Sequence, residues 1–136
     1  AGIPSAIEHF NRPLSQRQQW ILESLPEYGS NTIIRKKEIN LRDLSALTAK
    51  TGDEFHLFTK GGYRWVFRGN KTGINIIGSD SETLINGGWK LSGHTHPGTT
   101  DLCLIPSSDD YETLETLNQR QSVILGSLGQ YQIFGR

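Results

Sequence analysis

With 136 residues, 35% of them hydrophobic, the chain is long enough to bury the core of a single globular domain. Its 14 basic and 14 acidic side chains give a net charge of zero. Because nucleic-acid-binding proteins usually carry an excess of basic residues, we expect no nucleic-acid partner. The single cysteine, Cys103, excludes an internal disulfide, and no apolar run reaches the length of a membrane span, so we expect no membrane partner.

The first part of the chain predicts an arm followed by helices. Residues 1–13 have no clear period and contain two prolines, which favours an extended arm. Residues 15–26 and 40–52 place their apolar side chains at helical spacing, with capping residues at the ends. A short strand is expected between them, at residues 32–39. We therefore expect residues 1–52 to form an N-terminal arm with helices.

From Glu54 onward the apolar residues alternate, as they do in strands. Residues 54–60 and 63–69, joined by two glycines, predict a hairpin. The remaining segments predict strands at 74–77, 89–96, 121–127 and 129–136, and helices at 79–88 and 107–119. The second of these helices is expected to place Tyr111, Leu114 and Leu117 on its inner side. Helices followed by strands with helices between them favour an α/β fold with a mixed sheet flanked by helices. Residues 53–136 would be its core, within one compact domain.

Two histidines at the end of one predicted strand have the spacing of metal ligands. Side chains at i and i+2 of a strand share a face, so His94 and His96 would point the same way, and Pro97 ends the strand. If Ser107 caps the next helix, Asp110 lies in its first turn, and packing of that helix on the sheet can bring the carboxylate to the imidazoles. Two nitrogens and one oxygen, with a fourth position open, are typical of a catalytic zinc site.

The pattern H-x-H-P followed by P-S-x-x-D resembles the motif of the JAMM (MPN-plus) zinc metalloproteases. The resemblance implies a JAB/MPN-like layered fold, related to that of cytidine deaminases, with an N-terminal helical extension. It implies that His94, His96 and Asp110 bind Zn²⁺, and that Ser107 stabilises the oxyanion. The implied activity is hydrolysis of a peptide or isopeptide bond, with a protein or peptide as substrate.

The family also uses a glutamate, at the start of an apolar strand some tens of residues before the histidines, as general base. Glu54, which opens the strand EFHLFT, matches that position best. Glu38 is the second candidate, although no such strand follows it. His56 shares a strand face with Glu54 and can therefore lie near the site, but a partly buried sheet histidine is the simpler interpretation.

A second, looser resemblance covers residues 43–70, the histidine segment and the last strands. These stretches are similar to JAB-type domains at the C-terminal tips of bacterial polymorphic toxins. The resemblance implies that the domain is secreted or delivered into the cytoplasm of a target cell, where the single cysteine is compatible with a reducing environment. It also implies a cognate immunity protein as partner.

Other interpretations of the same residues stay open. His94 and His96 can be ordinary residues at a strand end, and Ser107 with Asp110 can be a helix-capping box, which does not exclude metal binding. A metal-dependent nuclease toxin and a non-catalytic MPN-like binding module are alternative functions. A nucleobase deaminase is disfavoured, because the chain lacks the H-x-E and P-C-x-x-C motifs of that class.

Overall fold

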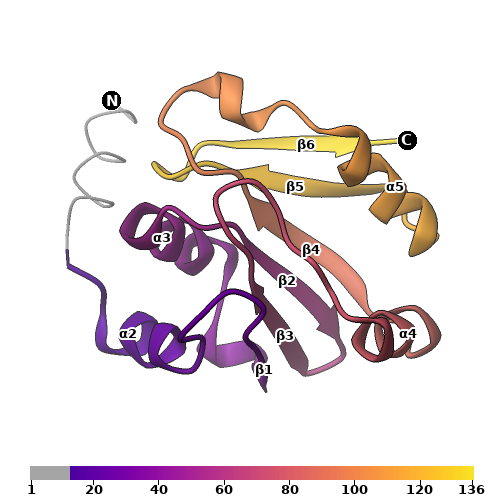
Figure 1. The fold of residues 1–136 in the computed structure, drawn as a ribbon, viewed down its shortest axis with the longest axis horizontal. Helices are drawn as coiled ribbons and strands as arrows, with labels where there is room; N and C mark the ends of the chain where they lie inside the picture. The colour runs from indigo at the N-terminus through magenta and orange to yellow at the C-terminus, as the bar shows by residue number, and fades with distance from the viewer. Residues whose placement is uncertain (1–12) are drawn as a thin grey trace.

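A computed structural model describes residues 13–136, so the predicted arm lies outside the described residues except for its last position. Within the described part, six strands form one mixed sheet in the order β1-β3-β2-β4-β5-β6 (Figure 1). Neighbouring strands run antiparallel except β4 and β5, which are parallel. The strands are β1 (Asn31–Arg35), β2 (Phe55–Lys60), β3 (Tyr63–Arg68), β4 (Lys90–Thr95), β5 (Gln121–Leu125) and β6 (Tyr131–Gly135).

Helices cover both faces of this sheet. They are α2 (Gln16–Glu23), α3 (Leu41–Thr51), α4 (Gly78–Asn86) and α5 (Ser108–Thr116), with short 3-10 helices η1 (Lys36–Glu38) and η2 (Asp101–Leu104). The α/β class, the mixed sheet and the flanking helices predicted above are confirmed. None of the helices formed by residues 13–136 is long and apolar enough to cross a membrane.

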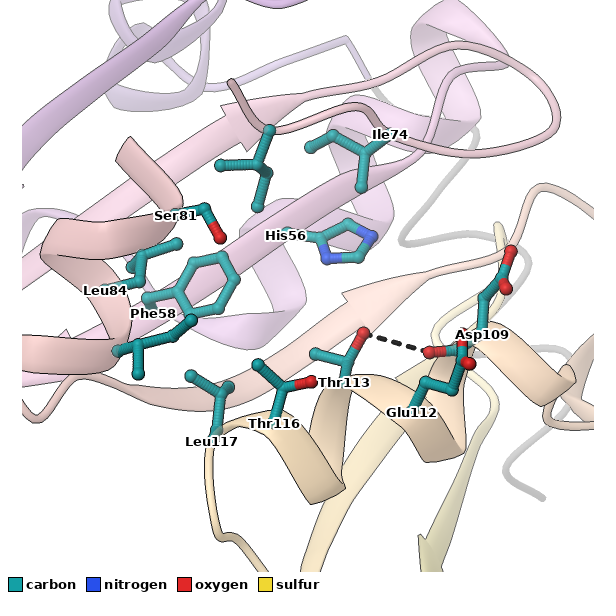
Figure 2. A pocket seen from close by; sticks show the side chains of 12 residues that line it. His56, Phe58, Ile74, Ser81, Leu84, Asp109, Glu112, Thr113, Thr116 and Leu117 are labelled. Carbon is teal, nitrogen blue, oxygen red and sulfur yellow. Dashed lines mark hydrogen bonds between the residues drawn. The ribbon is translucent and has the colours of Figure 1, made fainter. Parts of the chain in front are cut away.

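Strand alternation divides the core between the two faces. Leu57 and Val66 point to the side of α2 and α3, where they pack in one cluster with Ile21 and Leu44. Their chain neighbours Phe58 and Phe67 point the other way and pack with Leu84 of α4 and Leu117 after α5. Figure 2 shows Leu84 and Leu117 beside Phe58 on this second face. The result is a three-layer α/β/α arrangement.

The N-terminal helices and strand join the same layers as the rest of the chain. β1 pairs with β3 along its whole length, and α3 packs against β2 and β4. α3 is capped before its first residue by Asn40, whose side chain accepts a hydrogen bond from the Asp43 N–H, and after its last residue by Gly52 in the left-handed conformation (φ 76°). Both boundaries agree with the predicted capping residues.

A register shift in β4 changes which side chains share a face. Leu57 pairs with Gly93, but Phe58 pairs with Leu91, so Ser92 is the extra residue of a β-bulge. Leu91 therefore packs in the same cluster as Phe58 and Leu84, although strict alternation from His94 would point it to the other face. The bulge lets one strand supply both a core residue and a site residue to the α4–α5 side.

Two local predictions were wrong. Residues 74–77 form no strand: β3 already has β1 and β2 as neighbours, so Ile74 and Ile76 pack against the core from an irregular segment instead. Tyr111 was expected on the inner side of its helix, but it is 42% exposed and places its ring against the edge of Phe134. Leu114 fills the buried position of that helix.

Candidate metal centre

The two histidines at the end of β4 face α5. His94 is fully buried, and its Nε2 lies 3.2 Å from Nε2 of His96. Thr95, between them, points to the opposite face, where its hydroxyl accepts the Phe55 N–H at 2.9 Å and contacts the hydroxyl of Thr48 on α3. The strand geometry therefore aims both imidazoles the same way while the intervening side chain anchors the strand.

The aspartate reaches the imidazoles from the first turn of α5. Asp110 Oδ1 lies 2.9 Å from His94 Nε2, and Oδ2 lies 3.3 Å from His96 Nε2. Ser107 caps the same helix: its hydroxyl accepts the Asp110 N–H, and Asp110 Oδ2 accepts the Ser107 N–H. This capping box fixes the carboxylate at N3, so capping and convergence on the histidines occur together.

A backbone carbonyl sets the orientation of His96. Its Nδ1 lies 2.7 Å from the carbonyl oxygen of Cys103, where only an N–H donor makes a hydrogen bond. Nδ1 therefore carries the proton, and the Nε2 lone pair becomes available to a metal ion whenever Nε2 is deprotonated. Second-shell hydrogen bonds of this kind hold metal-ligating histidines in one tautomer. No sequence pattern identifies a backbone carbonyl, so this contact could be found only in the structure.

The electrostatics of the triad favour an ionised Asp110 carboxylate beside a neutral His94 and a His96 that holds its proton more strongly than usual. Burial acts to raise the pKa of Asp110, but hydrogen bonds from His94 and His96 outweigh it and lower that pKa well below its usual range. Burial lowers the pKa of His94. Burial opposes the charged form of His96 as well, yet its hydrogen bond to Asp110 and the charge of that carboxylate raise the pKa of His96 overall.

The spacing of the donor atoms suits a small divalent cation. A tetrahedral zinc ion with bonds of about 2.0–2.1 Å holds its ligand atoms about 3.3–3.4 Å apart. Donor atoms of His94, His96 and Asp110 are separated by 2.9, 3.2 and 3.3 Å, although the two contacts to Asp110 use different carboxylate oxygens. The triad of His94, His96 and Asp110 can thus hold a metal ion, and Glu54, His56 and His94 form a second group with donor atoms close enough to do so. Its donor set does not decide which metal.

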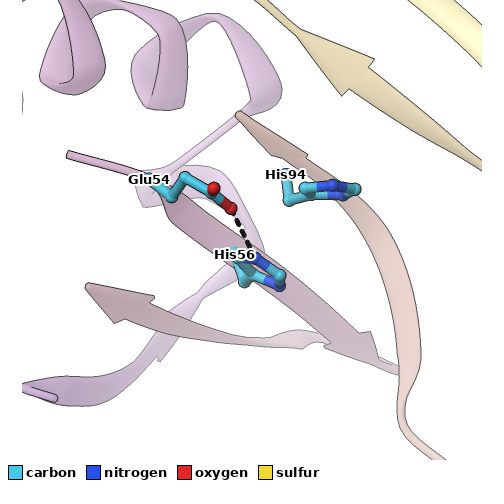
Figure 3. Close-up of side chains that lie close together, drawn as sticks. All are labelled: Glu54, His56 and His94. Carbon is cyan, nitrogen blue, oxygen red and sulfur yellow. Dashed lines mark hydrogen bonds and ion pairs between the residues drawn. The ribbon is translucent and has the colours of Figure 1, made fainter. Parts of the chain in front are cut away.

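Glu54 stands beside this triad, immediately before β2. Its backbone is held on both sides, because its N–H donates to Asn70 and its carbonyl accepts from Gly69. One donor atom each of Glu54, His56 and His94 lies within 4.8 Å of the others (Figure 3). Glu54 is only 7% exposed, and this burial raises the pKa of its carboxyl to about 7, against the lowering effect of His96 and His94.

A cleft of about 410 Å³ brings the predicted catalytic residues to one surface. Glu54, His96, Ser107 and Asp110 all line it, together with Lys71. Ser107 is exposed, and its hydroxyl oxygen accepts the Asp110 N–H, which leaves the hydroxyl hydrogen free to donate into the cleft. The second glutamate candidate, Glu38, ends η1, which directly follows the edge strand β1, and it does not line this cleft.

His56 is closer to the site than the simpler sequence interpretation implied. It pairs with His94 across β2 and β4, and their ring centroids are 4.6 Å apart. Its Nε2 lies 3.4 Å from Glu54 Oε1, and burial lowers its pKa to about 4, so the ring is neutral at pH 7 and can donate from Nε2 to the carboxylate. The sequence feature that indicated this position is that His56 and Glu54, two residues apart, share a strand face.

Comparison of the chain with protein-family models, with curated proteins and with solved structures finds no match.

Proposed function

We propose that the protein is a metal-dependent hydrolase of peptide or isopeptide bonds, resembling the JAMM metalloproteases, with zinc as the metal. The observation that supports this most is the convergence of His94, His96 and Asp110 beside a buried glutamate, at a cleft that Glu54, His96 and Asp110 line. Three protein ligands and an open side are what catalytic zinc sites share. Zinc bound there would supply a Lewis acid that acidifies water and polarises a carbonyl group.

Glu54 is the proposed general base. Its carboxylate takes a proton from the attacking water, whose oxygen forms a bond to the carbonyl carbon. The C–N bond then breaks, and Glu54 passes the proton to the departing nitrogen, so the amine and the carboxylic acid together account for all atoms of substrate and water. A carboxyl pKa of about 7 suits a group that must both accept and return a proton near neutral pH.

His56 and Ser107 have supporting roles in this proposal. The neutral His56 donates to Glu54 and orients its carboxylate toward the cleft. The Ser107 hydroxyl, which already accepts from the capping N–H, donates its hydrogen to the oxygen that becomes negatively charged during attack. Neither group needs to change its position in the fold for these contacts.

The acidic rim of the cleft supports a polypeptide over a nucleic acid. Asp109 is exposed at the cleft beside the triad, and Glu112 lies one turn further along α5. Two carboxylates repel a phosphodiester backbone, and Lys71 is the one lysine or arginine among the described residues that line the cleft. A nuclease would be expected to show the reverse balance.

Metal content and hydrolysis test the proposal together. Protein purified without added chelator should contain about one zinc per chain, and it should cleave a folded or unfolded protein substrate. Glu54→Gln should keep the zinc and lose cleavage, because it removes the base but none of the three ligands. Metal-free wild type that cannot be loaded with zinc would refute the proposal. Cleavage of tRNA or plasmid DNA in place of protein would favour the alternative of a metal-dependent nuclease. Zinc binding without hydrolysis of any of these substrates would favour the non-catalytic binding module.

The biological setting proposed from the resemblance is a toxin tip delivered into a target cell and blocked by an immunity protein. If this is correct, expression of the wild type in a bacterial cytoplasm should arrest growth, and expression of Glu54→Gln at the same level should not. Equal growth of the cells that express the two proteins would refute the proposal that the protein is a toxin, but it would not affect the hydrolase proposal.

A further inference from the structure

A second hollow, which we call the α4–α5 groove, adjoins the candidate catalytic cleft. It has a volume of about 340 Å³ and lies on the sheet face between α4 and α5 (Figure 2). The groove and the cleft share four lining residues: His56, Ile74, Asp109 and Thr113. A chain bound across the cleft therefore has a continuous path past His56 into the groove.

The floor of the groove is apolar. Phe58 and Leu84 are almost completely buried beneath it, and the half-buried Ile74 and Ile76 line one side. Ile85 of α4 is 42% exposed at the margin and extends the apolar lining there. The hollow is of a size that binding pockets for small groups have, and its floor suits a branched aliphatic side chain.

The opposite margin, on α5, is acidic. Asp109 and Glu112 are both exposed lining residues, and the ion pairs found among the described residues involve neither of them. Lys71 lines the cleft but not the groove. Two carboxylates beside an apolar floor are complementary to a ligand that has an aliphatic side chain next to basic ones.

We propose that the α4–α5 groove binds the substrate chain next to the bond that is cleaved, with an aliphatic side chain on the floor and a lysine or arginine beside it facing Asp109 and Glu112. The inference rests on the proposed function, since it treats the neighbouring cleft as the place of hydrolysis. It adds a sequence preference, aliphatic and basic, that the metal ligands alone do not imply. His56 marks the boundary between the two sites.

The experiment measures binding without catalysis. ¹⁵N-labelled protein, made metal-free with EDTA, is titrated at low salt with heptapeptides that have a glycine-serine frame and differ only at the centre. The first peptide has a leucine between two lysines, the second a leucine between two glutamates, and the third a serine between two lysines. The first should shift the amide resonances of residues 81–85 and 112–117. The second and third should bind at least about fivefold more weakly, because each lacks one of the two complementary features.

Two exposed glutamates on α5 provide a matched pair of variants. Glu112→Lys should weaken binding of the leucine–lysine peptide about fivefold or more, since it replaces an attraction by a repulsion. Glu115→Lys makes the same charge change one turn away, at a position that does not line the groove, and should change affinity less than twofold. Glu112→Gln, which introduces no new charge, should give an intermediate loss and guards against a folding defect in the lysine variant.

Equal affinities for the lysine and glutamate peptides, or equal affinities of the Glu112→Lys and Glu115→Lys proteins, would overturn the inference. So would shifts of the same amides by a short oligonucleotide but by none of the peptides. Because no metal is present, these outcomes are independent of the zinc and cleavage tests. If the leucine–lysine peptide binds in the groove but the protein binds no zinc, only the hydrolase proposal is refuted. If the protein cleaves its substrate but the groove shows no preference among the peptides, only the groove proposal is refuted.

Discussion

The carbonyl oxygen of Cys103 accepts a hydrogen bond from Nδ1 of His96 over 2.7 Å, and this contact joins the loop after β4 to the candidate metal centre. The loop is held by the carbonyl of Gly98, which accepts from the Ser127 N–H and the Gln130 side chain. The orientation of one proposed ligand therefore depends on backbone groups well removed from the metal position.

Substitution of Gly98 should weaken metal binding through this loop. A Cβ at Gly98 would lie 2.7 Å from the Cys103 Cβ, and the φ of 155° is one that other residues rarely adopt. We expect Gly98→Ala to displace the Cys103 carbonyl and lower zinc affinity about 10-fold or more, measured by competition with a chromogenic chelator. Gly78→Ala, where no atom lies within 4 Å of the added carbon, is the control. Unchanged affinity in Gly98→Ala would show that the carbonyl contact is not needed.

Removal of the Asp110 carboxylate should separate metal binding from helix capping. Asp110→Asn keeps an oxygen that can accept the Ser107 N–H but loses the charge between the two histidines. We expect its zinc content to fall close to zero, while Asp110→Ala loses zinc and, in addition, about 1 kcal/mol of stability through the lost cap. Zinc analysis and urea unfolding of the metal-free proteins measure the two effects. Asp109→Asn, one residue away and exposed, should retain both properties.

The buried carboxyl of Glu54 should leave a signature in the pH dependence of stability. Its pKa is about 7 in the folded protein and near 4.5 in the unfolded chain, so between these values the folded state binds more protons at this group. Its contribution to stability is therefore fully present below about pH 4.5 and decreases as pH rises toward 7.

Glu54→Gln cannot ionise and should not lose this contribution. For metal-free protein in EDTA, we expect the melting temperatures of Glu54→Gln and wild type to be similar at pH 4.5, and the variant to be the more stable at pH 8. Glu38→Gln, away from the cleft, is the matched control and should show no such divergence. A Glu54→Gln protein that is equally or less stable than wild type at pH 8 would contradict the buried, proton-retaining carboxyl.

The hydroxyl of Thr95 should matter for stability although it faces away from the metal centre. It accepts the buried Phe55 N–H and contacts the Thr48 hydroxyl, so Thr95→Val leaves the N–H without a partner. An unsatisfied buried donor costs about 1–3 kcal/mol, and we expect that loss in urea unfolding of the metal-free protein. Thr99→Val, at an exposed position, should change stability by less than about 0.5 kcal/mol. A loss equal to that of Thr99→Val would show that water replaces the hydroxyl.

The helix caps and the ligand spacing could be predicted because they depend on neighbours in the sequence. The capping boxes at Asn40 and Ser107 satisfy N–H groups three residues ahead, and strand geometry alone makes His94 and His96 share a face. The predicted strand at 74–77 could not be excluded from neighbouring residues alone, because whether an apolar segment pairs depends on which sheet edges are already occupied.

The α/β class, the first residues of the capped helices and the common direction of the two imidazoles could be inferred without a structure, since all of these follow from contacts within a few residues. Three contacts are visible only in the folded chain: Asp110 meets both histidines, His56 lies beside His94, and the Cys103 carbonyl orients His96. Those contacts depend on strand order, on the register of β2 against β4 and on a loop conformation. Each of these contacts joins residues from different segments of the chain. The pattern of side chains along the sequence does not predict such contacts, because the packing of the whole fold determines which segments meet.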